Sequence, residues 1–150
     1  MGMTKNMFTR LDHVGIACTD LDESIRFYRA VYGLEVCHRE KNDDQGVVEA
    51  MLRLNGSDDG GATYLQLLAP TRADSPVSKF LRSRGEGVHH IAFGCPDVDQ
   101  ASVSLQAKGM NVLFTPPRYA SMGSRATFLH PRECGGVLVE IVTSAGSASV

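Results

Sequence analysis

The chain has 150 residues, of which 43% are hydrophobic, so it is long enough to bury the core of one compact domain. Its formal net charge is −2 and it has no basic block, which argues against a nucleic-acid partner. No apolar run reaches membrane-spanning length, and the four scattered cysteines are typical of reduced thiols in a cytoplasmic protein.

The first half of the chain predicts a strand, a helix and three further strands. Asp20 and Glu23 form a capping-box pattern at the start of the helix, and Gly33 suits its C-terminal cap. The strands are rich in β-branched residues or alternate in polarity, and they are expected over 11–18, 34–39, 47–54 and 63–69. A short linker helix beginning at Ser75-Pro76 follows.

The second half predicts the same order of elements. A helix is expected from Asp97 to Gly109, a loop over 115–124, and strands over 89–94, 110–114, 125–129 and 137–142. We therefore predict an α+β fold of two tandem βαβββ modules in a single domain spanning 1–150. Its expected parts are module 1 at about 9–70, the linker with its short helix at 71–87, module 2 at about 88–143 and a frayed tail at 144–150.

A sequence repeat relates the two modules. Shifting the chain by 77 positions superimposes His13 on His90, within segments that also share a cysteine and two aspartates. A shift of 74 positions superimposes Gln66 on Glu140 in the last strand of each module. Because a duplication usually folds as two like halves about a pseudo-twofold axis, matched residues are expected to meet near that axis.

The four matched polar residues indicate a metal site. Each lies in an otherwise apolar strand, where a buried polar group needs a partner. Taken singly, they would be ordinary structural residues, since a lone strand histidine is most often a satisfied core residue. Taken together, two imidazoles, an amide and a carboxylate suit a divalent transition metal such as Co, Ni, Mn, Fe or Zn. Glu49 is then a candidate general base, although a solvated edge residue would give the same pattern.

Several segments between Leu11 and Val142 carry a resemblance to a known family. They are LDHVGIA (11–17), QGVVEAML (45–52), YLQLLAPT (64–71), SPVSKFL (75–81), RGEGVHHIAF (84–93), FLHP (128–131) and GGVLVE (135–140). With these segments the chain resembles the methylmalonyl-CoA epimerases of the vicinal-oxygen-chelate superfamily. The resemblance implies the cup-shaped sheet of that superfamily and a homodimer.

The resemblance also implies a reaction. It is the metal-dependent interconversion of (2R)- and (2S)-methylmalonyl-CoA, an acyl-CoA, by proton transfer at C2 through a metal-stabilised enolate. The implied metal is Co²⁺ first, with Mn²⁺, Ni²⁺ or Zn²⁺ as alternatives, and its implied ligands are His13, Gln66, His90 and Glu140. His89, which precedes the ligand His90, is expected to point to the opposite face and to belong to the core.

Roles for further residues follow from the same resemblance. Glu49 and Glu140 would remove and return the proton on opposite faces of C2. The loop after the second module's helix would contact the substrate through Ser121, Met122, Gly123 and Ser124. Related enzymes also accept ethylmalonyl-CoA, and no motif decides the acyl selectivity.

Other readings of the same pattern remain open. A glyoxalase I-type lactoylglutathione lyase uses a metal-bound glutamate as its base, so Glu49 would be surplus. A ring-cleaving dioxygenase needs only two histidines and one carboxylate on iron, so Gln66 would be surplus. A metal-free ligand-binding module, such as those that sequester bleomycin, would lack the ligand set that this chain carries.

Overall fold

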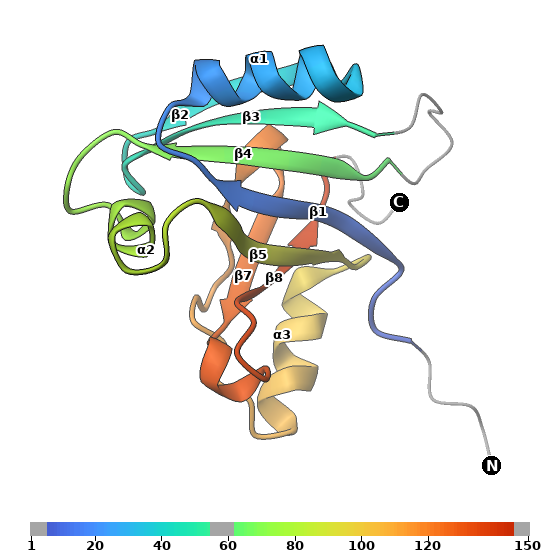
Figure 1. Ribbon diagram of the computed structural model, residues 1–150. Coiled ribbons are helices and arrows are strands. Elements are labelled where there is room, and N and C mark those ends of the chain that lie inside the picture. The colour runs from blue at the N-terminus through green and yellow to red at the C-terminus, as the bar shows by residue number, and fades with distance from the viewer. Residues whose placement is uncertain (1–5, 55–61, 146–150) are drawn as a thin grey trace. The chain divides into compact units, whose positions relative to one another are not determined.

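The computed structural model describes residues 6–54 and 62–145 (Figure 1). The helices are α1 (Leu21–Tyr32), α2 (Pro76–Arg84) and α3 (Val98–Ala107), with short 3-10 helices η1 (Ser121–Gly123) and η2 (Pro131–Glu133). The strands are β1 (Arg10–Ala17), β2 (Val36–Asn42), β3 (Val47–Arg53), β4 (Tyr64–Pro70), β5 (Gly87–Gly94), β6 (Arg118–Tyr119), β7 (Arg125–Leu129) and β8 (Val139–Thr143).

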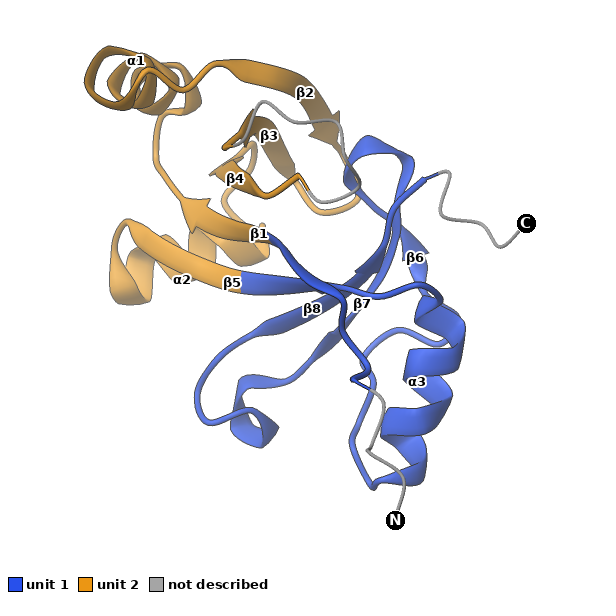
Figure 2. Cartoon of the chain, turned by 90° about the vertical axis from the view of Figure 1, so that its right-hand side faces the viewer, with its two compact units in different colours: residues 1–12, 91–150 blue, residues 13–90 orange. Residues whose placement is uncertain are grey.

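The order of these elements confirms the predicted α+β class. The chain runs β1-α1-β2-β3-β4, then α2, then β5-α3-β6-β7-β8, so the βαβββ order occurs twice. It divides into two compact units, residues 13–90 and residues 1–12 with 91–150 (Figure 2). Within the described residues, no helix combines the length and hydropathy needed to cross a membrane. Residues 146–150 of the expected frayed tail lie outside the described part of the chain.

In the unit of residues 13–90, β4 pairs in parallel with β1 and antiparallel with β3, which pairs with β2. Helix α1 covers one face of these strands (Figure 1), where Leu21 and Ile25 pack on Leu52 and Leu67. The helix begins as predicted, because Asp20 accepts a hydrogen bond from the Glu23 backbone. Burying the apolar residues of one strand face under α1 leaves the alternate residues on the opposite face.

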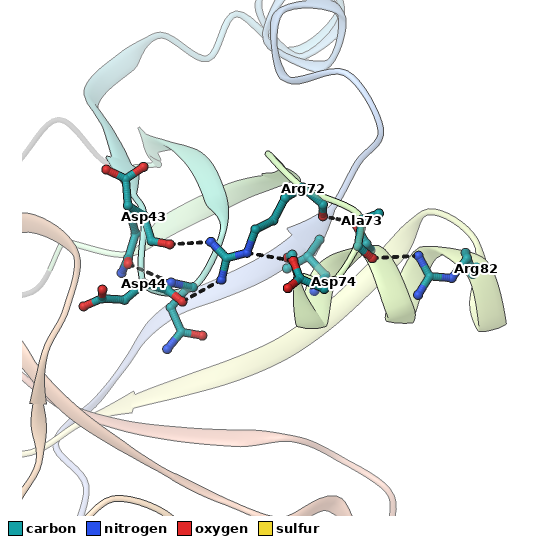
Figure 3. Close-up of polar contacts among 11 residues, drawn as sticks. Asp43, Asp44, Arg72, Ala73, Asp74 and Arg82 are labelled. Atoms are coloured by element: carbon teal, nitrogen blue, oxygen red, sulfur yellow. Dashed lines mark hydrogen bonds and ion pairs between the residues drawn. The ribbon is translucent and has the colours of Figure 1, made fainter.

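Helix α2 is held by two arginines (Figure 3). Arg72 donates to the backbone carbonyls of Asp43 and Asp44 in the turn between β2 and β3, and to the Asp74 carboxylate at 2.8 Å. Arg82 donates to the Ala73 carbonyl at 3.0 Å. These bonds tie the linker and the helix to the sheet of the same unit, where Val77 of α2 packs against buried residues of β1, β3 and β4.

The second unit repeats this pairing with β5 from residue 91 onward. Strand β8 pairs in parallel with β5 and antiparallel with β7, which pairs with the two-residue strand β6. Helix α3 packs its apolar residues, among them Val98 and Leu105, against Leu129 and Ile141. Its N-terminus is capped by Asp97, as the sequence predicts.

The strand predicted over 110–114 is wrong. Only a single bridge joins Val112 to Leu129, and the strand between α3 and β7 is instead β6. At Phe114, a side chain replaces the backbone ladder: the buried Thr127 hydroxyl accepts from the Phe114 N–H at 3.1 Å and donates to its carbonyl at 3.0 Å. A hydroxyl that satisfies both backbone groups leaves nothing there for a neighbouring strand to pair with.

Leu67→Ala tests the packing beneath α1. Leu67 is fully buried, so its truncation is expected to lower the free energy of unfolding by about 2–5 kcal/mol through lost burial and a residual cavity. Leu54→Ala is the matched control, since Leu54 is 46% exposed, and it should change stability by less than about 0.5 kcal/mol. Urea denaturation measures both, and equal losses would contradict this core.

Candidate active site

Two of the predicted metal ligands lie side by side. His13 on β1 and His90 on β5 are 3% and 4% exposed, and their Nε2 atoms are 3.1 Å apart. The ring planes are nearly perpendicular, at 89°. Both residues belong to the unit of residues 13–90. Two buried imidazole nitrogens that face one point can share one proton or bind one cation.

Gly15 provides the space for this pair. A Cβ atom at Gly15 would lie 2.1 Å from Cε1 of the His90 ring, well inside van der Waals contact. The requirement is steric, because the side chains at His13 and Gly15 point to the same face of β1 and any larger residue would fill the position of the His90 ring. The glycine two positions after His13 therefore makes room for the second histidine.

Gln66 and Glu49 form a second buried pair on this face. Gln66 lies opposite Gly15 of β1 and Met51 of β3 in the strand register. Its Nε2 donates to Oε2 of Glu49 at 2.9 Å, and both side chains are buried. Its Oε1 is also buried and has no hydrogen-bond partner in the described part of the protein. An orphaned buried carbonyl oxygen is costly unless something binds it.

These groups fit a divalent metal. The paired imidazole nitrogens of His13 and His90 and the orphaned oxygen of Gln66 are neutral donors of the kind that bind transition metals. The orientation of the Gln66 amide is consistent with that role, because its N–H donates to Glu49 and its oxygen has no hydrogen-bond partner among the described residues. The same Gln66 amide thus holds Glu49 through its nitrogen and offers its oxygen to a metal.

The remaining predicted residues lie in the other unit, where Glu140 is buried on β8 opposite Ala92 of β5. Ser121, Met122 and Gly123 form η1, and Met122 has a left-handed backbone with φ of 58°. Ser124 is buried and donates from Oγ to the Ser121 carbonyl at 2.7 Å. Oγ of Ser121 is buried without a hydrogen-bond partner among the described residues.

The contact of His89 with the ligand histidine His90 was missed by sequence reasoning. His89 is only half-buried, and its Nδ1 lies 2.9 Å from Nδ1 of His90, so its expected place in the core is wrong. Its ring meets the ring of Phe80 on α2 at a centroid distance of 5.0 Å. The signal available in the sequence was the His-His pair itself, in which only the second histidine matches the repeat.

The matched cysteines of the repeat take no part in this chemistry. Cys18 and Cys95 are buried, and burial is the main cause that raises the pKa of each thiol above its usual value. A raised pKa keeps a thiol protonated at neutral pH, and a protonated thiol is neither a good nucleophile nor a metal ligand. Both residues instead extend the apolar clusters under α1 and α3.

Comparison with known proteins gives a consistent set of relatives. The model of the Glyoxalase/Bleomycin resistance protein/Dioxygenase superfamily matches residues 12–128. A solved structure of a Streptomyces coelicolor methylmalonyl-CoA epimerase variant in complex with 2-nitronate-propionyl-CoA is 61% identical, has a TM-score of 0.89, and the match covers 92% of this chain and 99% of that one.

Two curated relatives are more distant. The mitochondrial methylmalonyl-CoA epimerase of Bos taurus is 34% identical over 88% of this chain and 73% of its own length. The ethylmalonyl-CoA/methylmalonyl-CoA epimerase of Cereibacter sphaeroides is 34% identical over 90% of this chain and 98% of its own length. The similarity therefore extends over most of the chain in each case.

Gly15→Ala tests the space beside His90. The added methyl group would displace a buried ring, so the free energy of unfolding is expected to fall by about 1–3 kcal/mol. Gly94→Ala is the comparison, because its methyl group would meet the flexible side chain of Arg10, 2.8 Å from Cζ, in place of a buried ring, and a smaller loss is expected. A Gly15→Ala protein as stable as the wild type, measured by urea denaturation, would contradict the close approach of His90.

Proposed function

This chain belongs to the methylmalonyl-CoA epimerase family of the Glyoxalase/Bleomycin resistance protein/Dioxygenase superfamily, and we propose that it interconverts (2R)- and (2S)-methylmalonyl-CoA. The observation that carries the proposal is the buried Glu49 carboxylate, which Gln66 holds through its amide N–H. A fixed carboxylate beside a candidate metal ligand is the arrangement that proton abstraction next to a carbonyl requires.

The proposed metal ligands are His13, Gln66, His90 and Glu140. The Nε2 contact between the histidines and the orphaned Gln66 oxygen support the first three. Glu140 is proposed because the two repeats place it and Gln66 in equivalent positions. Glu140 of β8 lies opposite Ala92 of β5, and Gln66 of β4 lies opposite Gly15 of β1. The repeat superimposes Ala92 on Gly15. A bound divalent ion, Co²⁺ in the first instance, would supply Lewis acidity to the thioester and carboxylate oxygens of the substrate.

The protein's own carboxylates would move the proton. Glu49 takes the proton from C2, the C–H bonding pair passes into the thioester carbonyl, and an enolate of the substrate forms. Return of a proton to the opposite face of C2 inverts the configuration. Glu140, released from the metal and protonated, is the proposed donor on that side; it then regains a proton from solvent, and Glu49 gives one up. Because Glu49 receives a hydrogen bond from Gln66, its carboxylate is oriented before the substrate arrives.

The segment of Ser121, Met122, Gly123 and Ser124 is the proposed contact for the acyl-CoA. Its support is the buried Ser121 hydroxyl, which lacks a partner among the described residues. The bond from the Ser124 hydroxyl to the Ser121 carbonyl holds the tight turn at Met122 in place. A fixed turn with a spare hydroxyl suits recognition of a carboxylate or carbonyl oxygen.

The family relationship favours this reaction over the other readings of the sequence. The relatives reported above are named as epimerases of methylmalonyl-CoA, and the one from Cereibacter sphaeroides also as an epimerase of ethylmalonyl-CoA. A lactoylglutathione lyase or a metal-free binding module would leave the Gln66–Glu49 pair without a purpose. We propose methylmalonyl-CoA as the principal substrate.

Glu49→Gln tests the base. The variant keeps the size of the side chain but removes the proton acceptor, so deuterium incorporation at C2 of methylmalonyl-CoA in D₂O should slow by about 100-fold or more. The control is Glu35→Gln, which alters an exposed carboxylate paired with Arg29 and should exchange at the wild-type rate. Wild-type exchange in Glu49→Gln would remove Glu49 from the mechanism.

Metal removal tests the cofactor. Protein treated with a chelator and desalted is expected to lose C2 exchange, and one equivalent of Co²⁺ per chain should restore it. Mass spectrometry of the metal content and NMR of the substrate report the two quantities on the same sample. Full exchange in protein shown to be free of metal would contradict a metal-dependent reaction.

A further inference from the structure

The ring of His90 is held at both of its nitrogens. Its Nε2 lies 3.1 Å from Nε2 of His13, and its Nδ1 lies 2.9 Å from Nδ1 of His89. The rings of His89 and His90 are close to perpendicular, at 87°, with their centroids 5.2 Å apart. The pair of neighbouring histidines is therefore in direct hydrogen-bond contact, on the side of His90 away from His13.

The direction of this bond decides what His90 offers at Nε2. A neutral imidazole carries one proton, so a proton on Nδ1 leaves a lone pair on Nε2, and a proton on Nε2 leaves none there. A metal ligand needs the lone pair. His90 is thus a ligand through Nε2 only when its Nδ1 is the donor to His89.

We propose that His89 is a positioning residue for His90: its Nδ1 accepts the Nδ1–H of His90 and so fixes both the tautomer and the ring orientation that present the Nε2 lone pair to the metal. The inference rests on the metal centre proposed above and extends it to a residue outside the ligand set. Histidine ligands of metals generally donate their other ring N–H to an acceptor that fixes the tautomer and the ring orientation.

His89 is itself held by the linker helix. Its ring meets the Phe80 ring of α2 edge to face, at 68° between the planes, and the Arg84 guanidinium lies 5.7 Å from the Phe80 centroid on the same helix. Helix α2 is in turn fixed by the Arg72 and Arg82 bonds (Figure 3). The linker between the two repeats therefore reaches the candidate site through one aromatic contact and one histidine.

Two substitutions of His89 by a polar side chain separate the effect of its hydrogen bond to His90 from the effect of its size. In asparagine the amide stands where Nδ1 of histidine stands, so His89→Asn keeps an acceptor for His90. In glutamine the amide reaches the Nε2 position instead, so His89→Gln keeps polarity and size but loses that acceptor. His130→Leu is a remote control, since this exposed histidine caps η2 through its own Nδ1.

The experiment measures Co²⁺ binding to the metal-free 150-residue chain, by calorimetry and by the visible absorption of the bound ion. His89→Gln is expected to raise the Kd for Co²⁺ by about 10–100-fold and to change the visible spectrum. His89→Asn should recover most of the affinity, and His130→Leu should match the wild type. Circular dichroism establishes that each variant is folded.

A second readout is nitrogen NMR of the histidine rings at neutral pH, in which a protonated Nδ1 of His90 is expected in wild type and in His89→Asn. Tight Co²⁺ binding by wild type with an unchanged Kd in His89→Gln would overturn the role of His89 alone. Wild type that binds no Co²⁺ would instead overturn the metal centre and the present inference together. The two failures are therefore distinguishable.

Discussion

The contact between His13 and His90 is the constraint on which the rest of the site depends. Burying two imidazoles costs free energy unless each finds a partner, and these two face each other at 3.1 Å in a space that Gly15 leaves open. Residues 77 positions apart must therefore come from strands that lie next to each other, and a duplicated chain provides such strands. The absence of a side chain at Gly15 is as much a part of the site as the histidines.

The Gln66 amide can both donate a hydrogen bond to Glu49 and offer an oxygen to a metal, which a carboxylate at position 66 could not do. Gln66 donates one hydrogen bond to Glu49 and retains an oxygen without a partner, whereas a glutamate there would repel Glu49 as a like charge. A neutral ligand also leaves Glu140 as the one anionic residue of the proposed ligand set, so more of the metal's positive charge would act on the substrate. The asymmetry between the two repeats at this position, amide in one and carboxylate in the other, is thus chemically useful.

Local signals predicted most of the fold, because caps and strand periodicity are properties of neighbouring residues. Asp20, Asp97 and Gly33 cap their helices as expected, and β7 has the expected bounds. The strand expected over 110–114 did not form beyond one bridge, since the Thr127 hydroxyl takes both backbone groups of Phe114, a tertiary feature without a sequence pattern. Alternation likewise predicts which face a strand residue takes but not its ring rotation, so the contact of His89 with His90 was missed.

The most direct test of the metal centre is an anomalous difference map from crystals of the Co²⁺-loaded protein, recorded on both sides of the cobalt absorption edge. One cobalt ion per chain is expected, bound by Nε2 of His13, Nε2 of His90, Oε1 of Gln66 and the Glu140 carboxylate, with its remaining positions open. Cobalt bound elsewhere, or bound to the histidines without Gln66 and Glu140, would contradict the ligand set that the repeat implies.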